Sequence, residues 1–364
     1  MKVAVVGSGL AGFTAYQTLR RELAPEEIAV FGVEDDPAAT FSRRATAIRQ
    51  REMRSESDGH CSPVSFPGLS LRAAVRRRSP APLAGALTDR FHPTVPEFLD
   101  HVERLRERSG WSRSLVRGRI ERVHAVERGF ELDGYGVFEH VLLAPGHPGL
   151  NVPEELRDDP RAVHSYEPHD YACTVTVVGA GLAAATEWLN ALAAGAEVVS
   201  VRRREPLRRP LNVPRELLTR RGLAGFHRLP GHERAERLRT LLTPSYPPGR
   251  QWDEPLAHAE VEGRFRVEQS VNGSAQVICA TGFLHGFRHD ALLSNLVDAY
   301  GLETVGDWIV LDPDGTVPSL TRVGRTLALA GAPAQWAYPG ADSIGGAKVV
   351  AHAFLRRVRA CRTR

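Results

Sequence analysis

Short apolar runs, each followed by a glycine-rich turn and then by an amphipathic stretch, occur twice in similar form along the chain. Val3-Ala4-Val5-Val6 and Val175-Thr176-Val177-Val178 are continuous runs of the kind found in parallel strands that are covered on both faces. Residues 13–21 and 185–193 follow the two turns and carry apolar side chains at helical spacing. A further apolar run follows each predicted helix. The pattern predicts two βαβ units and therefore an α/β fold.

A glycine fingerprint lies between each strand and its helix. The first is Gly7-Ser8-Gly9-Leu10-Ala11-Gly12, and the second is Gly179-Ala180-Gly181-Leu182-Ala183-Ala184. In such a motif the first glycine allows the tight turn, the second lets backbone approach a pyrophosphate, and the third small residue lets helix and strand pack closely. The pyrophosphate then meets free N–H groups and the positive end of the helix dipole. Because both fingerprints have the strand–turn–helix context, we expect two bound dinucleotides.

The two units differ at the end of their second strand. The run at 28–33 is followed by Glu34, whose carboxylate can accept hydrogen bonds from ribose hydroxyls. The run at 197–201 is followed by Arg202-Arg203-Arg204 and has no carboxylate at that place. Arginine binds phosphate with two parallel hydrogen bonds, so Arg202 and Arg203 predict a site for the 2′-phosphate of NADPH. The alternative is a solvated basic turn in an arginine-rich chain.

Composition narrows the class of protein. The chain has 364 residues, of which 42% are hydrophobic and 25% charged, enough for a large core and for about two to three domains. The net charge is only +4 and nearly all of the basic residues are arginine, so we expect no nucleic-acid partner. No signal peptide or apolar stretch of membrane-spanning length is present. We therefore expect a cytoplasmic protein without a membrane partner, and a homodimer stays open.

The patterns of cysteine and histidine residues disfavour two kinds of chemistry. The four cysteines form no C-x-x-C pair, which disfavours dithiol exchange. The histidines show no metal-ligand spacing, so we expect no metal site.

Two later strand-to-glycine turns bound the middle of the chain. The stretch 138–148 runs from an apolar strand into a turn at Gly146, and 275–283 runs into Thr281 and Gly282. Glycine at such a strand end allows backbone to approach a cofactor closely. Both turns are therefore candidates for cofactor contacts.

The stretch between these turns starts with the second fingerprint and predicts an inserted domain. We expect residues 1–165 and 280–364 to form the first, discontinuous domain, and residues 172–279 to form the second. Proline and glycine at 145–153 and at 282–286 predict two crossings between the domains, each a candidate hinge.

These features resemble the two-dinucleotide-binding flavoproteins, which include thioredoxin and glutathione reductases, flavin-containing monooxygenases and N-hydroxylating monooxygenases. The resemblance covers nearly the whole chain, and Ala280-Thr281-Gly282-Phe283 is similar to the A-T-G motif of the flavin-dependent monooxygenases. It implies two Rossmann-like, three-layer (ββα) domains, the second inserted into the first. It also implies FAD at the first fingerprint with Glu34, and NADPH at the second with Arg202 and Arg203.

The resemblance also suggests roles for Gly345, Gly346 and Ala347, which open a C-terminal amphipathic stretch. They resemble the start of the helix that points at the flavin pyrimidine ring, where its dipole stabilises negative charge on reduced flavin. An ordinary helix start is the alternative.

A histidine and two loops complete the set of candidates. His164 resembles the last residue of the signature F-x-G-x-x-x-H, but Asp158 and Pro160 replace its Phe and Gly. His164 is therefore either functional or a linker histidine. Polar loops at 49–65 and 90–96 are candidates to line the flavin and the substrate, with contacts from Arg51, Arg54, Ser55 and His60.

By the same resemblance, NADPH reduces the flavin, and the electrons then have three possible fates. The absence of C-x-x-C and the A-T-G string favour a monooxygenase that oxidises a small metabolite with O2 through a C4a-hydroperoxyflavin. The short chain, with little room for a substrate domain, favours a non-oxygenating reductase or dehydrogenase of a small molecule or carrier. A non-catalytic nucleotide-binding flavoprotein is the third alternative, and the intact glycines argue against it. No side chain is assigned to catalysis.

Overall fold

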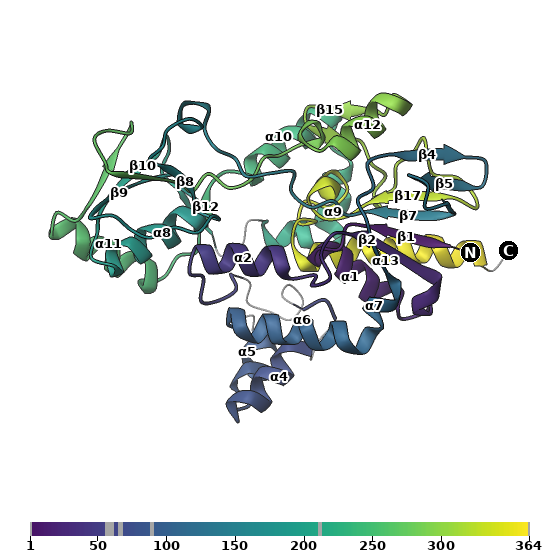
Figure 1. Ribbon diagram of the computed structural model, residues 1–364, viewed down its shortest axis with the longest axis horizontal. Helices are drawn as coiled ribbons and strands as arrows, with labels where there is room; N and C mark the ends of the chain where they lie inside the picture. The colour runs from purple at the N-terminus through teal and green to yellow at the C-terminus, as the bar shows by residue number, and fades with distance from the viewer. Residues whose placement is uncertain (1, 55–61, 65–67, 88–90, 210–212, 363–364) are drawn as a thin grey trace.

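The computed structural model describes residues 2–54, 62–64, 68–87, 91–209 and 213–362 (Figure 1). Two of the expected loop contacts, Ser55 and His60, lie outside these residues. Two five-stranded sheets dominate the described chain, and each has its own hydrophobic core. The structure confirms the predicted α/β class with two Rossmann-like domains.

The first sheet is parallel and contains the strand that precedes the first fingerprint. Its order is β17–β7–β1–β2–β3, formed by β1 (Val3–Val6), β2 (Ile28–Gly32), β3 (Leu115–Arg117), β7 (His140–Leu143) and β17 (Thr326–Leu329). All residues of β1 are apolar and buried, as a central strand covered on both faces requires. Because β17 comes from the far end of the sequence, the second unit is inserted into the first, as predicted.

Two further layers cover the first sheet. On one face, α1 (Leu10–Leu19) packs against α13 (Ile344–Arg362). On the other lies a small antiparallel sheet of β4 (Val123–Val126), β5 (Gly129–Leu132) and β6 (Val137–Phe138) (Figure 1). Phe31 and Phe138 join the sheets, with ring centroids 5.5 Å apart and ring planes nearly perpendicular. This is the predicted three-layer arrangement.

A group of helices extends from the first domain between β2 and β3. It consists of α2 (Ala39–Ala47), α4 (Gly68–Arg77), α5 (Ala81–Leu87), α6 (Val95–Ser109) and α7 (Trp111–Ser114) (Figure 1). A capping box starts α6: the Thr94 hydroxyl accepts the Glu97 N–H at 3.3 Å. The Glu97 carboxylate also accepts two hydrogen bonds from Arg77, at 2.7 and 2.6 Å, which tie α4 to α6.

The second sheet is also parallel, in the order β13–β10–β9–β14–β8. Its strands are β8 (Ala162–His164), β9 (Thr174–Val178), β10 (Glu197–Val201), β13 (Phe265–Glu268) and β14 (Gln276–Cys279), and α8 (Leu182–Ala193) and α11 (Arg250–Val261) pack together beside it. The fully buried Trp188 fills this core, with its ring edge-on to Phe265 at 5.6 Å. β8, which precedes the boundary expected at residue 165, pairs with β14 in this sheet.

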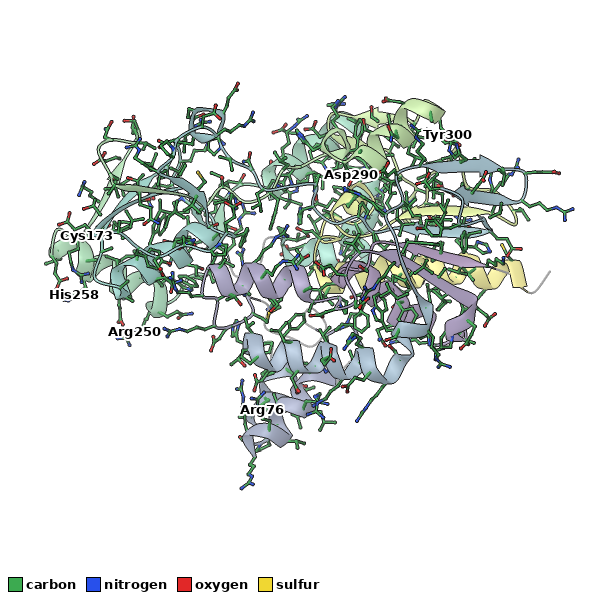
Figure 2. The ribbon with its side chains drawn as sticks, viewed as in Figure 1. Arg76, Cys173, Arg250, His258, Asp290 and Tyr300 are labelled. Atoms are coloured by element: carbon green, nitrogen blue, oxygen red, sulfur yellow. The ribbon has the colours of Figure 1, made fainter. Side chains whose placement is uncertain are left out.

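A third group of elements packs on the first core, although part of it lies within the stretch expected to form the second domain. It includes α9 (Arg220–His227), α10 (Gly231–Leu241) and α12 (Ala291–Tyr300) (Figure 1). The buried side chains of Phe226, Leu238, Leu293 and Trp308 belong to the first core. Tyr300 joins α12 to β4, since its hydroxyl accepts the Ala125 N–H at 2.6 Å (Figure 2). The chain therefore has a helical group in addition to its two domains.

The two crossings between the domains pair with each other. An antiparallel bridge joins Leu150 to Phe283, the Asn151 N–H donates to the Gly282 carbonyl at 3.0 Å, and the Leu284 N–H donates to the Gly149 carbonyl at 2.9 Å. The two candidate hinges thus form one short ribbon.

Candidate functional site

The turn between β1 and α1 has one open glycine and two closely packed ones. Gly7 has a φ of 119°, and a Cβ there would clash with the Ala144 carbonyl. A Cβ on Gly12 would clash with the Gly7 carbonyl. A Cβ on Gly9, the N-cap of α1, would meet nothing within 4 Å. Leu10 and Ala11, which open the helix, are partly exposed. The space beside Gly9 fits a pyrophosphate at a helix N-terminus.

The turn between β9 and α8 repeats this geometry. Gly179 has a φ of 137°, and a Cβ there would clash with the Ala280 carbonyl. At Gly181, the N-cap of α8, the nearest atom to an added Cβ is 4.0 Å away. Ala184, in the third position, is fully buried, so the packing accommodates its methyl group. Leu182 and Ala183 form the first turn of the helix.

Glu34 lies just beyond β2, where the sequence analysis expects a ribose contact. Its carboxylate accepts a hydrogen bond from Arg43 of α2 at 2.9 Å, and both side chains are exposed. Since a carboxylate has several acceptor positions, this ion pair leaves room for a ribose hydroxyl. Arg43 was not singled out from the sequence, because only the fold brings α2 back to the end of β2.

The arginines that follow β10 have different surroundings. The Arg202 side chain is 13% exposed, lies over the Trp188 ring and pairs with Glu205 at 2.9 Å. The Arg203 side chain is 91% exposed and lies 3.7 Å from Glu155. A cavity of about 930 Å³ is lined by Gly179, by these two arginines and by Arg204. Arg203 and Arg204 are thus the more available for a phosphate.

A cleft of about 540 Å³ separates residues 48–54 of the first domain from the second domain. Leu182 and Ala183 of α8 line one side of it, and Arg54 lines the other. The structure thereby brings a candidate contact of the first domain close to the start of the second fingerprint's helix.

Arg54 reaches across this cleft. Its guanidinium donates to the Arg209 carbonyl at 2.9 Å and to the Ser245 hydroxyl at 3.3 Å. Burial, together with the charge of Arg209, lowers the pKa of Arg54 to about 10. At neutral pH the guanidinium still carries its charge into the boundary between the domains.

Asp342 is a charged residue that no motif indicated. It lies in the turn that precedes α13, within range of the Arg54 charge. Burial raises the pKa of Asp342 to about 6, against the opposing effects of the Arg54 charge and a hydrogen bond from Gln335. No sequence pattern indicates Asp342, because only the fold brings it close to Arg54 and Gln335.

The segment expected to open a C-terminal helix does start α13, and a serine caps the first turn. The Ser343 hydroxyl accepts the Gly346 N–H at 3.0 Å and donates to the Gly340 carbonyl at 2.7 Å. A Cβ on Gly346 would clash with that carbonyl, and Ala347 is buried. Gly345 is partly exposed and is the most accessible of the three expected contacts. Their contact with a flavin stays a prediction.

The remaining candidates lie at the crossing. Gly146 and Gly282 have φ values of 85° and 76°, and an added Cβ on either would meet nothing within 4 Å. The Thr281 hydroxyl donates to the Asn151 carbonyl, and Thr281 lines the cavity beside the second fingerprint. The positive φ values explain why glycine occupies both positions.

His164 has partners that favour the linker role. Its Nδ1 accepts the Tyr166 N–H at 3.1 Å, so Nε2 carries the proton and donates to the Gly282 carbonyl at 3.0 Å. Burial lowers the pKa of His164, which keeps the ring neutral. The two ring nitrogens of His164 therefore connect its own segment to the crossing at Gly282.

An aromatic stack that the sequence analysis did not foresee spans the crossing. The Phe283 ring stacks nearly parallel with His147, at a centroid distance of 4.3 Å, and with Tyr166, at 5.1 Å. The Arg44 guanidinium lies 4.6 Å from the centre of the same Phe283 ring. The three rings come from separate segments of the chain, and no periodic pattern in the sequence predicts that they meet.

The described residues add no metal or disulfide chemistry. Among them, no group of three or more His, Cys, Asp or Glu is placed to hold a metal ion. Cys173 is exposed at the outer side of the second domain (Figure 2) and Cys279 is buried, both as free thiols, while Cys61 lies outside the described ranges. No helix in the described part of the chain is long and apolar enough to cross a membrane.

No protein-family model and no curated protein matches the sequence, but solved structures match the fold. A cadaverine monooxygenase of desferrioxamine biosynthesis from Erwinia amylovora, bound to FAD, has a TM-score of 0.76 and 14% identity over 98% of this chain and 94% of its own. An ornithine N-hydroxylase from Kutzneria sp. 744, with reduced FAD, NADP⁺ and L-ornithine, has a TM-score of 0.74 and 14% identity over 99% of each chain.

A reductase has a similar fold. Bacillithiol disulfide reductase from Bacillus cereus matches with a TM-score of 0.59 and 15% identity over 98% of this chain and 99% of its own. At such identities the likeness shows the fold alone. The chain therefore has the two-domain architecture found in these oxidoreductases, whose chemistry differs from one to another.

Proposed function

We propose that this protein is a flavin-dependent monooxygenase that uses NADPH and O2 to oxidise a small metabolite. The observation that carries the proposal is the pair of open glycines, Gly9 and Gly181, each at the N-terminus of a helix in one of two adjoining domains. When bound, NADPH supplies a hydride, and FAD accepts it and passes electrons to O2. The FAD-containing monooxygenases of the same fold support this reaction class.

In the first domain, the residues present fit FAD. Backbone N–H groups at the start of α1, next to Gly9, would bind the pyrophosphate. Glu34, held by Arg43, would accept hydrogen bonds from the ribose. The start of α13 at Gly345 would face the pyrimidine ring, where the positive end of the helix dipole favours negative charge.

In the second domain, the residues present fit NADPH. The start of α8, next to Gly181, would bind the pyrophosphate. Arg203 and Arg204 line the adjoining cavity and would bind the 2′-phosphate. We infer a preference for NADPH over NADH from these two cations and from the absence of a carboxylate at the end of β10.

The substrate side of the site is assigned to the boundary between the domains. Arg54 lines the cleft, and Asp342 lies within the range of its charge. Two opposite charges at this boundary would orient a small molecule that carries charge of its own. We propose these two residues as positioning groups for the substrate.

A non-oxygenating reductase is the second candidate. The observation in its favour is the fold that this chain shares with bacillithiol disulfide reductase. The sequence has no C-x-x-C pair, so a dithiol within the protein is not the electron carrier in this alternative.

One experiment separates the candidates. The purified, FAD-loaded protein is mixed anaerobically with NADPH, and separately with NADH, and its flavin spectrum is followed before and after O2 is admitted. Bleaching by NADPH, then an oxygen-dependent transient before the oxidised spectrum returns, is the expected result. Bleaching with direct reoxidation would favour the reductase. No bleaching by either coenzyme would overturn the proposal.

A further inference from the structure

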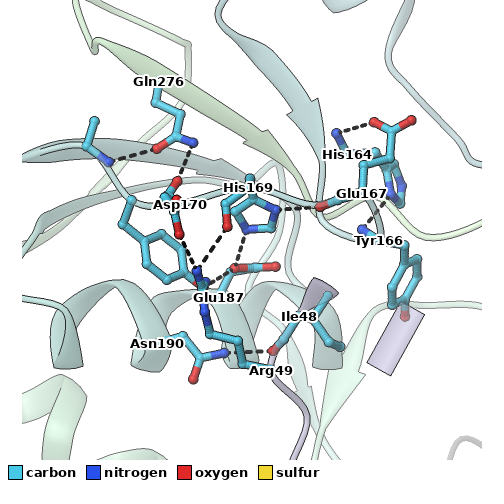
Figure 3. Close-up of polar contacts among 12 residues, drawn as sticks. Ile48, Arg49, His164, Tyr166, Glu167, His169, Asp170, Glu187, Asn190 and Gln276 are labelled. Atoms are coloured by element: carbon cyan, nitrogen blue, oxygen red, sulfur yellow. Dashed lines mark hydrogen bonds and ion pairs between the residues drawn. The ribbon is translucent and has the colours of Figure 1, made fainter. Parts of the chain in front are cut away.

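A buried histidine–carboxylate pair lies where the two domains meet, outside the two dinucleotide sites. Glu187 of α8 is fully buried, and its Oε2 accepts hydrogen bonds from His169 Nε2 at 3.2 Å and from the Tyr171 hydroxyl at 2.7 Å (Figure 3). The other oxygen, Oε1, is buried without a hydrogen-bond partner. The His169 side chain is only 3% exposed. A buried carboxylate of this kind is costly unless a cation accompanies it.

The first domain contacts this pair through the segment that follows α2. Arg49 donates to the His169 carbonyl at 2.9 Å and to the Asp170 carboxylate at 3.0 Å, and its guanidinium lies 4.5 Å from the centre of the Tyr171 ring. Asn190 of α8 donates to the Ile48 carbonyl at 2.8 Å (Figure 3). The same segment continues to Arg54 and lines the interdomain cleft. The contacts of the pair therefore determine where one wall of the cleft lies.

The hydrogen bonds of His169 require both of its ring nitrogens to donate. Nε2 faces the Glu187 carboxylate, and Nδ1 lies 2.7 Å from the Glu167 carbonyl. Since a carbonyl and a carboxylate only accept, both bonds form together only when the imidazole carries two protons. Burial alone would lower the pKa of His169, but the hydrogen bond and charge of Glu187 raise it above its ordinary value.

We propose that the protonated His169–Glu187 pair is a clamp that fixes the second domain on the first, and that loss of one proton from His169 releases it. The proton on Nδ1 leaves to solvent, because the Glu187 carboxylate is a stronger acceptor than the Glu167 carbonyl and keeps the Nε2 proton. The Nδ1 lone pair then faces the Glu167 carbonyl, so that hydrogen bond is lost, and the buried Glu187 carboxylate no longer has a cation beside it. Breaking a buried pair in this way is strongly destabilising. The contacts of Arg49 with the linker and of Asn190 with the Ile48 carbonyl then separate.

The charged and titratable groups around His169 agree with this direction. Glu187 faces it from α8, Tyr171 and Asp170 from its own linker, and Arg49 from the first domain. Burial and the charge of Glu187 raise the pKa of Tyr171, so its hydroxyl stays a donor to the carboxylate. Because the pKa of His169 is raised in the folded state, the clamp is complete at low pH and is lost as pH rises through that value.

Hydrogen–deuterium exchange of the full-length protein tests the clamp without reference to catalysis. Deuterium uptake by peptides covering 47–54 is compared at pH 6 and pH 9, with labelling times scaled for the intrinsic exchange rate. We expect uptake there to be about tenfold faster at pH 9, because local opening of this segment becomes more favourable when the clamp is lost. In His169→Gln the fast uptake should be present at both pH values.

A surface pair provides the matched control. His258 of α11 lies 3.0 Å from Glu262 on the exposed face of the second domain (Figure 2). His258→Gln removes a histidine–glutamate pair from the same domain and should leave the uptake of 47–54 as in the unmodified protein. If His169→Gln does not fold, Arg49→Gln opens the clamp from the other side and should give fast uptake at both pH values. Equal uptake by the unmodified protein at pH 6 and pH 9, or unchanged uptake in the folded variants, would overturn the proposal.

Discussion

Arg202 and Arg203 are neighbours in the sequence, but their side chains have different tasks. Arg202 covers the Trp188 ring and pairs with Glu205, so its burial contributes to the second core. Arg203 extends into solvent beside the cavity next to Gly179. A basic string after a strand thus contains both a packing arginine and an arginine that is available to a ligand.

A substitution at each position separates these tasks. Arg203→Ala should weaken NADP⁺ binding about tenfold and leave NAD⁺ binding unchanged, because it removes one charge-assisted contact to the 2′-phosphate. Calorimetric titration with both coenzymes measures the effect. In Arg202→Ala we expect a lower thermal unfolding temperature, since Trp188 loses its cover. An equal loss of both coenzymes in Arg203→Ala would contradict the 2′-phosphate assignment.

At the scale of elements, the strand–turn–helix unit explains why the glycine fingerprint could be identified from the sequence. β1 needs an apolar residue at every position, and α1 must start immediately beside it. The turn then has two kinds of glycine. Gly7 and Gly12 are required by backbone packing, whereas Gly9 faces open space and is required only if a ligand occupies that space.

This difference predicts opposite phenotypes for two glycine substitutions. Gly9→Val should leave the thermal unfolding temperature of the flavin-free protein unchanged and abolish flavin retention, because its side chain would occupy the pyrophosphate site. Gly12→Ala should destabilise the fold by about 1–3 kcal/mol, the usual cost of overpacking. Flavin absorbance of the purified variants and their urea unfolding curves provide the two measurements. Normal flavin content in Gly9→Val would refute the first site.

At the scale of the whole molecule, the chain has two large cores joined by a narrow ribbon. The first contains β1, α13 and the helical group, and the second is built around Trp188. Between them lie the ribbon of Leu150 and Phe283, the aromatic stack, and the hydrogen bond of Arg49 to the linker.

Separate cores predict separate unfolding. Scanning calorimetry should resolve two transitions, and NADP⁺ should move only the transition of the second domain. At a coenzyme concentration of 100 times its dissociation constant, the stabilisation should be about 2.7 kcal/mol. Addition of FAD to the flavin-free protein should move the other transition and is the matched control. A single transition that both ligands shift equally would contradict the independence of the cores.

Local signals account for the parts that could be predicted. The β-branched runs, the two fingerprints and the turns at Gly146 and Gly282 all lie within short stretches of sequence, and backbone geometry fixes what glycine does there. They suffice for the α/β class and for the place of both open helix starts. They did not indicate that residues 213–242 pack on the first core, because an amphipathic helix carries no mark of which apolar surface will cover it.

The sequence by itself determined two strand–turn–helix units and the insertion of one in the other, because hydrophobic period and glycine conformation act over a few residues. Tertiary structure alone decided which arginine remains exposed, how Asp342 comes within range of the Arg54 charge, and how Arg49 meets the linker at His169 and Asp170. These contacts join charged and aromatic side chains from segments that are far apart in the sequence. The partners and the pKa shifts of these side chains therefore follow from the packed fold, and no single segment of sequence predicts them.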